Sequence, residues 1–260
     1  PDVAERATRW TDQLGRHGAE IDSQGVALLA SRFRLHDADI DAVMSRTANR
    51  PIPAGRATRS EALGLGLICS VFSVAILGLA TNWLAAALLA FTIFFYAVVY
   101  TMWLKRATPQ NIVIGGIAGA APPLMGWATM TGMQGEWDWP HALLLVLIIF
   151  VWTPPHFWSL ALYRTKEYAK AGMPMLPVTH GPEYTRLQIL LYTILLFGVT
   201  LMPYIIRMSG LIYLVCAVLL SGVFLAYAIG MYRDYSDKLA HKTFRYSIWY
   251  LAALFAALLV

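Results

Sequence analysis

The sequence predicts an all-α membrane protein, a bundle of about seven transmembrane helices. Hydrophobic residues make up 58% of the 260-residue chain and charged residues only 13%, whereas a soluble domain carries about 25% charged residues. Seven apolar runs reach or approach the roughly 20 helical residues that cross a bilayer. These features exclude a soluble globular domain, a disordered chain and a nucleic-acid-binding domain, and they make the lipid bilayer the expected surroundings.

The expected spans follow one another with short connections. They lie near 62–82, 83–104, 111–132, 141–163, 187–206, 210–232 and 244–260. The polar pair Thr81-Asn82 separates the first two spans, and the last span is short. Pro154 and Pro155 fall inside the fourth span. We expect them to break its hydrogen-bond ladder, because proline has no N–H donor and clashes with the preceding turn.

Basic residues alternate between the connections. They lie mostly in the segments around 32–61, 105–110, 164–186 and 233–243. The alternate connections, at 81–82, 134–139 and near 207, together contain a single basic residue, Arg207. Because lysine and arginine are enriched in cytoplasmic loops, the pattern predicts a multi-pass protein of the cell inner (plasma) membrane with these four segments in the cytoplasm. The polar chemistry is therefore expected on that face.

The first 36 residues do not share this character. Their best apolar patch, Val26 to Ala30, is far too short to span a bilayer, and five of the chain's 15 acidic residues lie there. We expect residues 1–36 to form an atypical soluble or disordered segment and residues 37–260 to form the membrane domain.

Asp37 and Asp41 are the first candidates for chemistry. Residues four apart share one face of a helix, and two like charges there are destabilising unless a cation lies between them. Mg²⁺ is the natural candidate, because it binds one or two carboxylates together with substrate phosphates. A solvated helix end beside a basic loop explains the same pattern equally well.

Three blocks of sequence are similar to one known family. They are DADID followed by RTANRPIPAGR over 37–56, VVYTMWLKRATPQNIVIGGIAGAAPPLMGW over 98–127, and WTPPHFWSLALYRTKEYAKAGMPMLPV over 152–178. In this order they resemble the haem-prenylating branch of the UbiA superfamily of intramembrane prenyltransferases, the protohaem IX farnesyltransferases or haem O synthases. The resemblance runs from Asp37 to the end of the chain and implies a UbiA-type helix bundle.

The resemblance also implies a reaction and a set of site residues. A farnesyl group would pass from farnesyl diphosphate to a vinyl group of haem b, giving haem O for haem A synthase downstream. Mg²⁺ and nearby cations would stabilise the diphosphate as its C–O bond breaks. The implied catalytic residues are Asp37, Asp41, Lys105 and Arg106, with Mg²⁺ on the two aspartates. The implied substrate-binding residues are Arg50, Tyr100, Asn111, His156, Arg164, Lys166, Glu167 and Tyr168.

Several of these residues could equally have a structural role with no part in the reaction. Basic side chains such as Lys105 at the end of a span also serve as ordinary anchors at the membrane surface. The segment from Arg164 to Glu167 would equally suit a solvated loop.

His156 is the most unusual residue for a lipid environment. It lies eight residues before Arg164, or about 12 Å below the membrane surface at the helical rise of 1.5 Å per residue. A polar ring at that depth is expected to face a cavity or the bundle interior, and we expect it to serve the haem, at the iron or through a hydrogen bond. The alternative is a histidine that satisfies carbonyls freed by Pro154 and Pro155.

The chain departs from the family pattern in three places. The family has nine spans, and the two that are missing here would precede Asp37. Phe33 stands where the family places an asparagine, and Glu167 stands where many relatives have aspartate. The alternatives are therefore an inactive, N-terminally truncated relative and a UbiA-type enzyme that prenylates a quinone precursor. A transporter would show internal repeats with paired broken helices, and no second copy of the Pro154-Pro155-His156 segment is visible.

Overall fold

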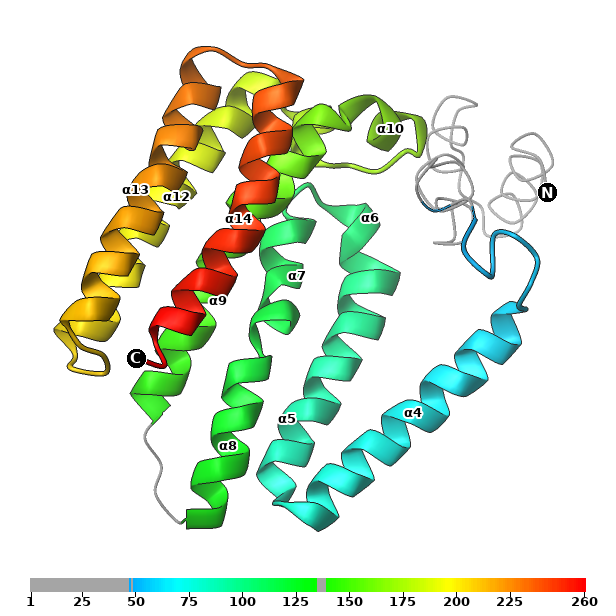
Figure 1. The fold of residues 1–260 in the computed structure, drawn as a ribbon. Helices are drawn as coiled ribbons and strands as arrows, with labels where there is room; N and C mark the ends of the chain where they lie inside the picture. Colours follow the sequence, from blue (N-terminus) through cyan, green and yellow to red (C-terminus); the bar gives the residue numbers. More distant parts are fainter. Residues whose placement is uncertain (1–46, 48, 135–138) are drawn as a thin grey trace, which may run out of the picture.

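The computed structural model describes residue 47 and residues 49–134 and 139–260, and every regular element in these ranges is a helix (Figure 1). The helices are α4 (Arg59–Ala80), α5 (Trp83–Phe94), η1 (Phe95–Leu104), α6 (Lys105–Ala107), α7 (Asn111–Ala120), α8 (Pro122–Gln134), α9 (Trp139–Tyr163), α10 (Thr165–Lys170), α11 (Leu176–Thr179), α12 (Gly181–Ile205), α13 (Leu211–Arg233) and α14 (Asp237–Ala257). The predicted all-helical class is confirmed.

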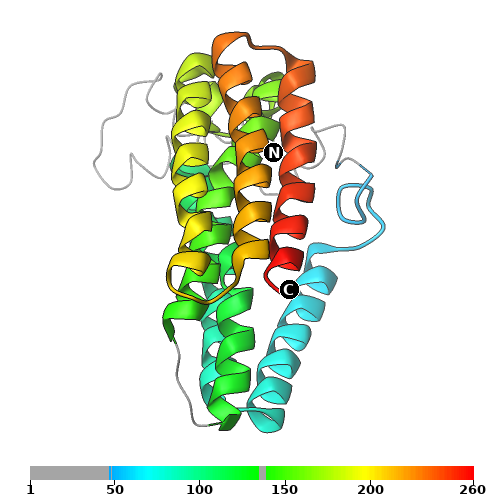
Figure 2. The same ribbon diagram turned by 60° about the vertical axis from the view of Figure 1, so that its left-hand side comes forward.

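The long helix α9 lies at the centre of the bundle. It packs against α7 and α8 and also against α12 and α14, while α13 packs against both α12 and α14 (Figure 2). At the other edge, α4 packs against α5 and diverges from the bundle toward its first residue (Figure 1). The helices η1 and α7 therefore lie between the packed group of α9, α12, α13 and α14 and the more open edge formed by α4 and α5.

Six of the predicted spans are confirmed as helical segments of sufficient length and apolar character to cross a membrane. The seventh, expected at 244–260, belongs to α14, which begins earlier, at Asp237, and carries more polar residues. At 21 residues α14 has a length of about 31 Å, and it buries Tyr250 and Leu254 completely against its neighbours. It packs along α9 and α13 as a full member of the bundle.

The expected break at Pro154 and Pro155 was wrong, and a second proline pair shapes another span. The expected span 111–132 is confirmed as a membrane-length segment, Asn111–Met130, and within it α7 ends at Ala120 and α8 begins at Pro122, because proline suits the first turn of a helix. By contrast, α9 runs unbroken for 25 residues through Pro154 and Pro155. Neighbouring helices make such prolines tolerable inside membrane helices, and α9 packs against α7, α8, α10, α11, α12 and α14.

Polar side chains at the helix starts explain two of the boundaries. Thr58 and Glu61 form a reciprocal capping box at the start of α4. The Asn82 side chain caps α5 by accepting a hydrogen bond from the Ala85 N–H at 2.9 Å. Its amide also donates to the carbonyl of Ala128 at 2.9 Å, so the predicted separator of the first two spans ties α5 to α8.

The second predicted span changes its helical type halfway. From Phe95 to Leu104 the chain forms a π-helix, in which each N–H reaches the carbonyl five residues back. The Lys105 N–H still follows this pattern by donating to the Tyr100 carbonyl, and the Thr101 hydroxyl donates to the Tyr96 carbonyl at 2.8 Å. Sequence patterns gave no warning of this wider helix, which is frequent at functional sites.

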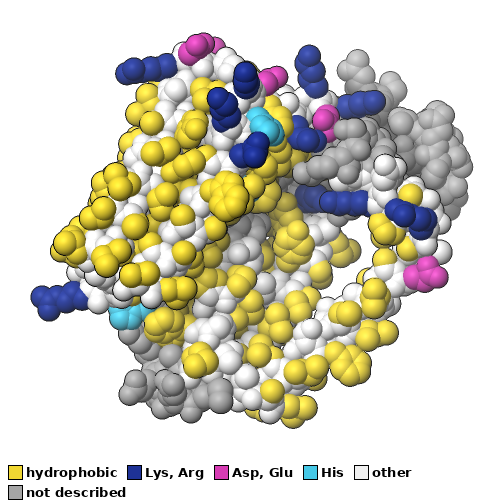
Figure 3. All heavy atoms as spheres, viewed as in Figure 1, with side chains coloured by type: hydrophobic (Ala, Val, Ile, Leu, Met, Phe, Trp, Pro, Cys, Tyr) yellow, Lys and Arg dark blue, Asp and Glu magenta, His cyan; other side chains and the backbone are white. Residues whose placement is uncertain are grey.

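Charged connections gather at one end of the bundle. The links around α6, around α10 and between α13 and α14 all lie at the upper end in Figure 1. Lysine and arginine side chains concentrate over this end and near the start of α4 (Figure 3). Arg207 lies in the α12–α13 connection, toward the other end. We call the charge-rich end the basic end.

Candidate functional site

A cavity of about 290 Å³ lies between η1, α7 and α9. Its walls are Tyr96 and Tyr100 of η1, Ile112, Gly115, Gly116 and Gly119 of α7, and Ile149, Trp152, Thr153 and Phe157 of α9. None of these side chains is charged, and four are aromatic. Figure 3 shows the surface hollowed between α14 and α4, with hydrophobic side chains in the hollow. Walls of this kind suit an apolar chain or a flat ring.

Three glycines shape the α7 wall. Their spacing places Gly115, Gly116 and Gly119 on one face of the helix. A Cβ atom at Gly115 would lie 2.5 Å from Cδ2 of Tyr100, and one at Gly116 would lie 3.1 Å from Cγ2 of Thr153. A Cβ at Gly119 would meet nothing within 4 Å. The first two glycines therefore admit neighbouring side chains, whereas Gly119 borders open space.

Asn111 braces the backbone where η1 ends. Its side chain is fully buried, and its amide donates to the Lys105 carbonyl at 3.0 Å. Its Oδ1 atom has no hydrogen-bond partner among the described atoms. Asn111 thus holds the backbone at Lys105, the first residue of α6. Lys105 follows Tyr100, whose ring lines the cavity, by five residues. Contact between Asn111 and substrate stays a prediction.

The predicted residues of the third block divide into surface and core. Nη1 of Arg164 and Oε2 of Glu167 form an ion pair at 3.2 Å, with 25% and 36% of their side chains exposed. Lys166 is exposed, whereas Tyr168 is buried in the core shared by α9, α11 and α12. Their helix α10 packs against α9 and α11, while α6 packs against η1 and α7. Lys105 is therefore the first residue of α6 and Arg164 directly precedes α10, and both helices lie at the basic end (Figure 1).

A further charged group joins α12 to the α13–α14 connection at this end. The Arg186 guanidinium lies over the Tyr235 ring, 5.5 Å from its centre, and the Tyr235 hydroxyl donates to Oδ1 of Asp237 at 2.6 Å. Burial raises the pKa of Tyr235 above its usual range, and the hydrogen bond to Asp237 acts in the same direction. Tyr235 is thus uncharged at ordinary pH and links Arg186 of α12 to Asp237 at the start of α14.

His156 lies inside the bundle, as expected from its depth, with 7% of the residue exposed. Its ring stacks between Trp152 and Phe244, and its Nδ1 atom is 2.6 Å from Oγ of Ser247 on α14. This partner differs from the carbonyls freed by the prolines, which were the alternative explanation for a histidine here. His156 is therefore tied to the neighbouring helix α14.

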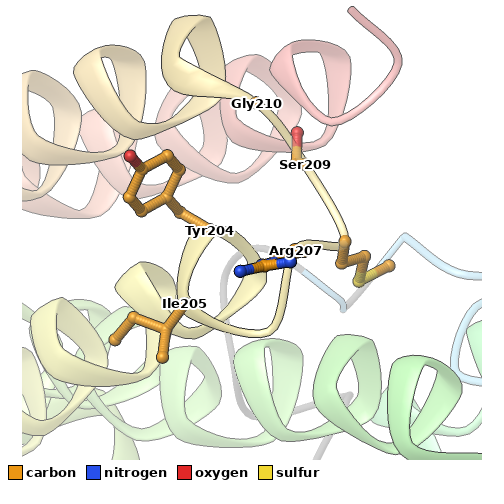
Figure 4. A pocket seen from close by; sticks show the side chains of 6 residues that line it. Tyr204, Ile205, Arg207, Ser209 and Gly210 are labelled. Carbon is orange, nitrogen blue, oxygen red and sulfur yellow. The ribbon is translucent and has the colours of Figure 1, made fainter.

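Two other recesses are less suitable as the main site. An apolar pocket of about 120 Å³ lies between α5, α7, α8 and α9, lined by residues such as Phe91 and Met125. A recess of about 550 Å³ lies at the α12–α13 connection, around Tyr204, Arg207 and Ser209 (Figure 4). Arg207 is exposed there, and the recess is remote from the basic end (Figure 1).

Comparison with known proteins identifies the family. The model of the UbiA prenyltransferase family matches residues 34–257. This chain belongs to that family. Two relatives named protoheme IX farnesyltransferase illustrate the similarity. The Burkholderia vietnamiensis (strain G4 / LMG 22486) protein is 59% identical over 221 residues, covering 85% of this chain and 72% of the relative. The Hahella chejuensis (strain KCTC 2396) protein is 56% identical over 243 residues, covering 92% and 80%.

Solved structures show the same UbiA fold. A digeranylgeranylglyceryl phosphate synthase superimposes with a TM-score of 0.70 at 18% identity, covering 90% of this chain and 80% of that one. A UbiA homolog from Archaeoglobus fulgidus bound to DMAPP and Mg²⁺ gives a TM-score of 0.53 at 17% identity, covering 90% and 84%. With its membrane-length helices, this UbiA family member is a multi-pass membrane protein. The family expected from the three sequence blocks is confirmed.

Several predicted site residues fall outside the part of the chain that the structure describes. Asp37 and Asp41 lie outside it altogether, and the side chain of Arg106 is not described. Arg50 is exposed in the turns before α4. Within the described ranges, no three His, Cys, Asp or Glu side chains gather as a metal site, and the Glu167 carboxylate is paired with Arg164. The Mg²⁺ site on Asp37 and Asp41 therefore stays a prediction.

Sequence reasoning missed most of the cavity wall. Tyr96 lies four residues before Tyr100, and their rings stand 5.3 Å apart, a spacing that a helical pattern would have placed on one face. The sequence did offer one indication for Ser247, because a hydroxyl side chain within a predicted span usually faces other helices and not lipid. The contact between Ser247 and His156 joins residues 91 positions apart, and local sequence patterns do not encode such a pairing.

Proposed function

We propose that this protein transfers a farnesyl group from farnesyl diphosphate to a vinyl group of haem b, giving haem O and diphosphate. One observation carries the proposal: relatives named protoheme IX farnesyltransferase are 56–59% identical to this chain over 85% or more of its length. The apolar cavity beside a basic end suits both substrates, because farnesyl and porphyrin need apolar walls and diphosphate needs cations.

The basic end receives the diphosphate in this proposal. Lys105 acts as a point charge and Arg164 as a planar fork for phosphate oxygens, with Arg106, Arg50, Lys166 and Tyr168 completing the expected set. Arg164 is held in place by Glu167. As the C–O bond of farnesyl diphosphate breaks, these cations stabilise the negative charge that develops on the leaving group.

The cavity receives the allylic carbocation. Aromatic faces attract cations, and the rings of Tyr96, Tyr100, Trp152 and Phe157 surround the space in which the first farnesyl carbon would lie. The uncharged walls also limit the water that would trap the carbocation. The terminal carbon of the haem vinyl group then forms a bond to this carbon, which leaves the positive charge on the vinyl carbon next to the porphyrin ring. Water adds to that carbon and releases a proton to solvent, which completes the hydroxyethylfarnesyl side chain.

Mg²⁺ is proposed as the cofactor, held by Asp37 and Asp41. It would supply Lewis acidity toward the diphosphate oxygens. The carboxylates at this i, i+4 spacing have the chemistry that Mg²⁺ prefers. We place residues 37–260 in the catalytic membrane domain and residues 1–36 in a separate segment.

The proposed setting is the cell inner membrane with the basic end in the cytoplasm, as the alternation of basic residues indicates. Water-soluble farnesyl diphosphate headgroups would then reach Lys105 from the cytoplasm. Haem A synthase is the expected user of the product.

The test is the mass of haem extracted from membranes that contain the protein. Purified chain in detergent, given haem b, farnesyl diphosphate and Mg²⁺, should produce haem O. Lys105→Ala should lower the rate at least tenfold, because one charge-assisted contact contributes about 1.5–3 kcal/mol. Lys170→Ala, which removes an exposed cation at the end of α10, is the matched control. Prenylation of a quinone precursor with unmodified haem would contradict the proposal.

A further inference from the structure

The imidazole of His156 is clamped on both faces. Trp152 stacks on one side at 4.2 Å between ring centres with planes 19° apart, and Phe244 of α14 stacks at 4.7 Å and 27°. Phe157 meets the ring edge-on at 4.8 Å. A ring held in this way keeps one orientation, so its two nitrogens have fixed directions.

Proton counting assigns the tautomer of this ring. The Ser247 hydroxyl donates to the Phe244 carbonyl at 2.6 Å, and a carbonyl can only accept. A hydroxyl carries a single hydrogen, so Ser247 must accept in its second contact, with Nδ1 of His156 at 2.6 Å. Nδ1 therefore carries the proton, and in the neutral imidazole Nε2 holds an unshared electron pair.

The free nitrogen points away from α14. Nδ1 faces Ser247 on α14, and Nε2 lies on the opposite side of the imidazole. Ile149, Trp152 and Thr153 of α9 line the cavity, and His156 follows them at helical intervals of seven, four and three residues, which places it on the same face of α9. His156 is therefore not itself a lining residue of the cavity but lies on the same face of α9, one helical turn beyond Trp152 and Thr153 toward the basic end.

This arrangement matches a metal-ligating histidine. Such a histidine donates its second ring N–H to a nearby acceptor, which fixes the tautomer and raises the basicity of the ligating nitrogen. A free cation would need several protein ligands, and the described ranges contain no group of three His, Cys, Asp or Glu side chains. Iron in a porphyrin brings its own equatorial nitrogens and needs only an axial ligand from the protein.

We propose that Nε2 of His156 ligates the iron of the haem substrate, and that Ser247 is the positioning residue that keeps this nitrogen unprotonated and correctly aimed. The inference rests on the proposed function, because it takes haem b as the acceptor. It adds a covalent anchor on the iron that would hold the porphyrin in one position while its vinyl group meets the farnesyl carbon. No electron transfer is required, since the histidine contributes the electron pair of the new bond.

The test compares variants of the full chain in detergent. Ser247→Ala should weaken haem binding by about ten- to hundredfold, the usual effect of losing a partner of a metal-ligating histidine, and should alter the absorption bands of bound haem. Ser247→Thr keeps the hydroxyl and should restore both. Ser221→Ala is the matched control, because Ser221 is another buried hydroxyl of the bundle, bonded to Thr200 and Tyr250, and should change neither.

A second variant distinguishes loss of the iron ligand from misfolding of the protein. His156→Gly should lose the absorption bands of histidine-ligated haem, and added imidazole should restore them by entering the vacated space. Affinity for farnesyl diphosphate, measured in the same preparations, should stay unchanged.

Three outcomes would overturn the inference: unaltered haem affinity and spectrum in Ser247→Ala, a wild-type haem spectrum in His156→Gly without imidazole, or equal weakening by Ser221→Ala. Failure of the proposed function is distinguishable, because the wild-type chain would then make no haem O whatever the haem spectrum of its variants.

Discussion

Alanine substitutions along the α7 glycine face should separate cavity shape from helix stability. Gly115, Gly116 and Gly119 lie on one face of one helix and line one cavity, yet an added methyl group meets different surroundings at each. At Gly115 the new Cβ would lie 2.5 Å from the Tyr100 ring, at Gly116 it would lie 3.1 Å from Thr153, and at Gly119 it would meet open space.

The structure sets the magnitude of each effect. Ordinary van der Waals contact begins at 3.4 Å, so Gly115→Ala requires the Tyr100 ring to withdraw by about 1 Å. Such overpacking costs about 1–3 kcal/mol, while alanine in a helix interior is about 0.5–1 kcal/mol better than glycine. Gly115→Ala should therefore lower the free energy of unfolding by between zero and about 2.5 kcal/mol. Gly119→Ala should raise it by about 0.5–1 kcal/mol.

The activities should follow the displacement of Tyr100. A shift of about 1 Å in a substrate-positioning group can lower kcat/KM by about a hundredfold, so farnesyl transfer should fall ten- to hundredfold in Gly115→Ala, less in Gly116→Ala and least in Gly119→Ala. Thermal unfolding and haem O formation would be measured on the same detergent preparations. Equal loss of activity in all three variants would refute the reasoning, because the methyl groups meet unequal surroundings.

Three further substitutions test the basic end against the opposite end. Asn111→Ala should lower the free energy of unfolding by about 1–3 kcal/mol, since it removes the hydrogen bond from a fully buried side chain to the Lys105 carbonyl, and should lower kcat/KM as well; an unchanged rate would show that the brace does not position Lys105. Arg164→Ala should raise KM for farnesyl diphosphate about tenfold but alter stability by less than about 1 kcal/mol, because its ion pair with Glu167 is partly exposed; a loss of stability without a change in KM would assign Arg164 to the fold. Asn82→Ala removes the cap of α5 and should cost about 0.5–2 kcal/mol of stability with normal kcat/KM; a fall in kcat/KM for correctly folded protein would contradict the location of the site.

The sequence predicted those features that depend on local pattern. Apolar length located the spans, and Asn82 marked the boundary between α4 and α5 because its side chain caps a helix. The three conspicuous blocks identified the family, and two of them supply walls of the cavity, through Tyr100 and Trp152. The depth of His156 in its span correctly predicted a position inside the bundle.

Features that depend on partners distant in the chain could not be predicted in this way. Proline rules predicted a break in α9 at Pro154, yet packing by neighbouring helices keeps α9 continuous. The start of a new helix at Pro122, inside the predicted span 111–132, was not predicted at all. The pairing of His156 with Ser247 requires α14 to lie against α9, which no local pattern determines.

The cavity itself depends on irregular backbone. In hydrocarbon, non-helical or altered backbone is tolerated only where protein surrounds it or where it lines a cavity. Two of the three walls carry such departures: η1 is wound as a π-helix and α7 stops before Pro122, whereas α9 stays helical through the Pro154-Pro155 pair just before His156. Regular helices with leucine in place of the α7 glycines would fill the space between η1 and α9. The π-helix and the glycine face instead let the Tyr100 ring approach α7 at Gly115 while the space beside Gly119 stays open, so the same residues that weaken helix regularity create the room that a prenyl acceptor and donor require.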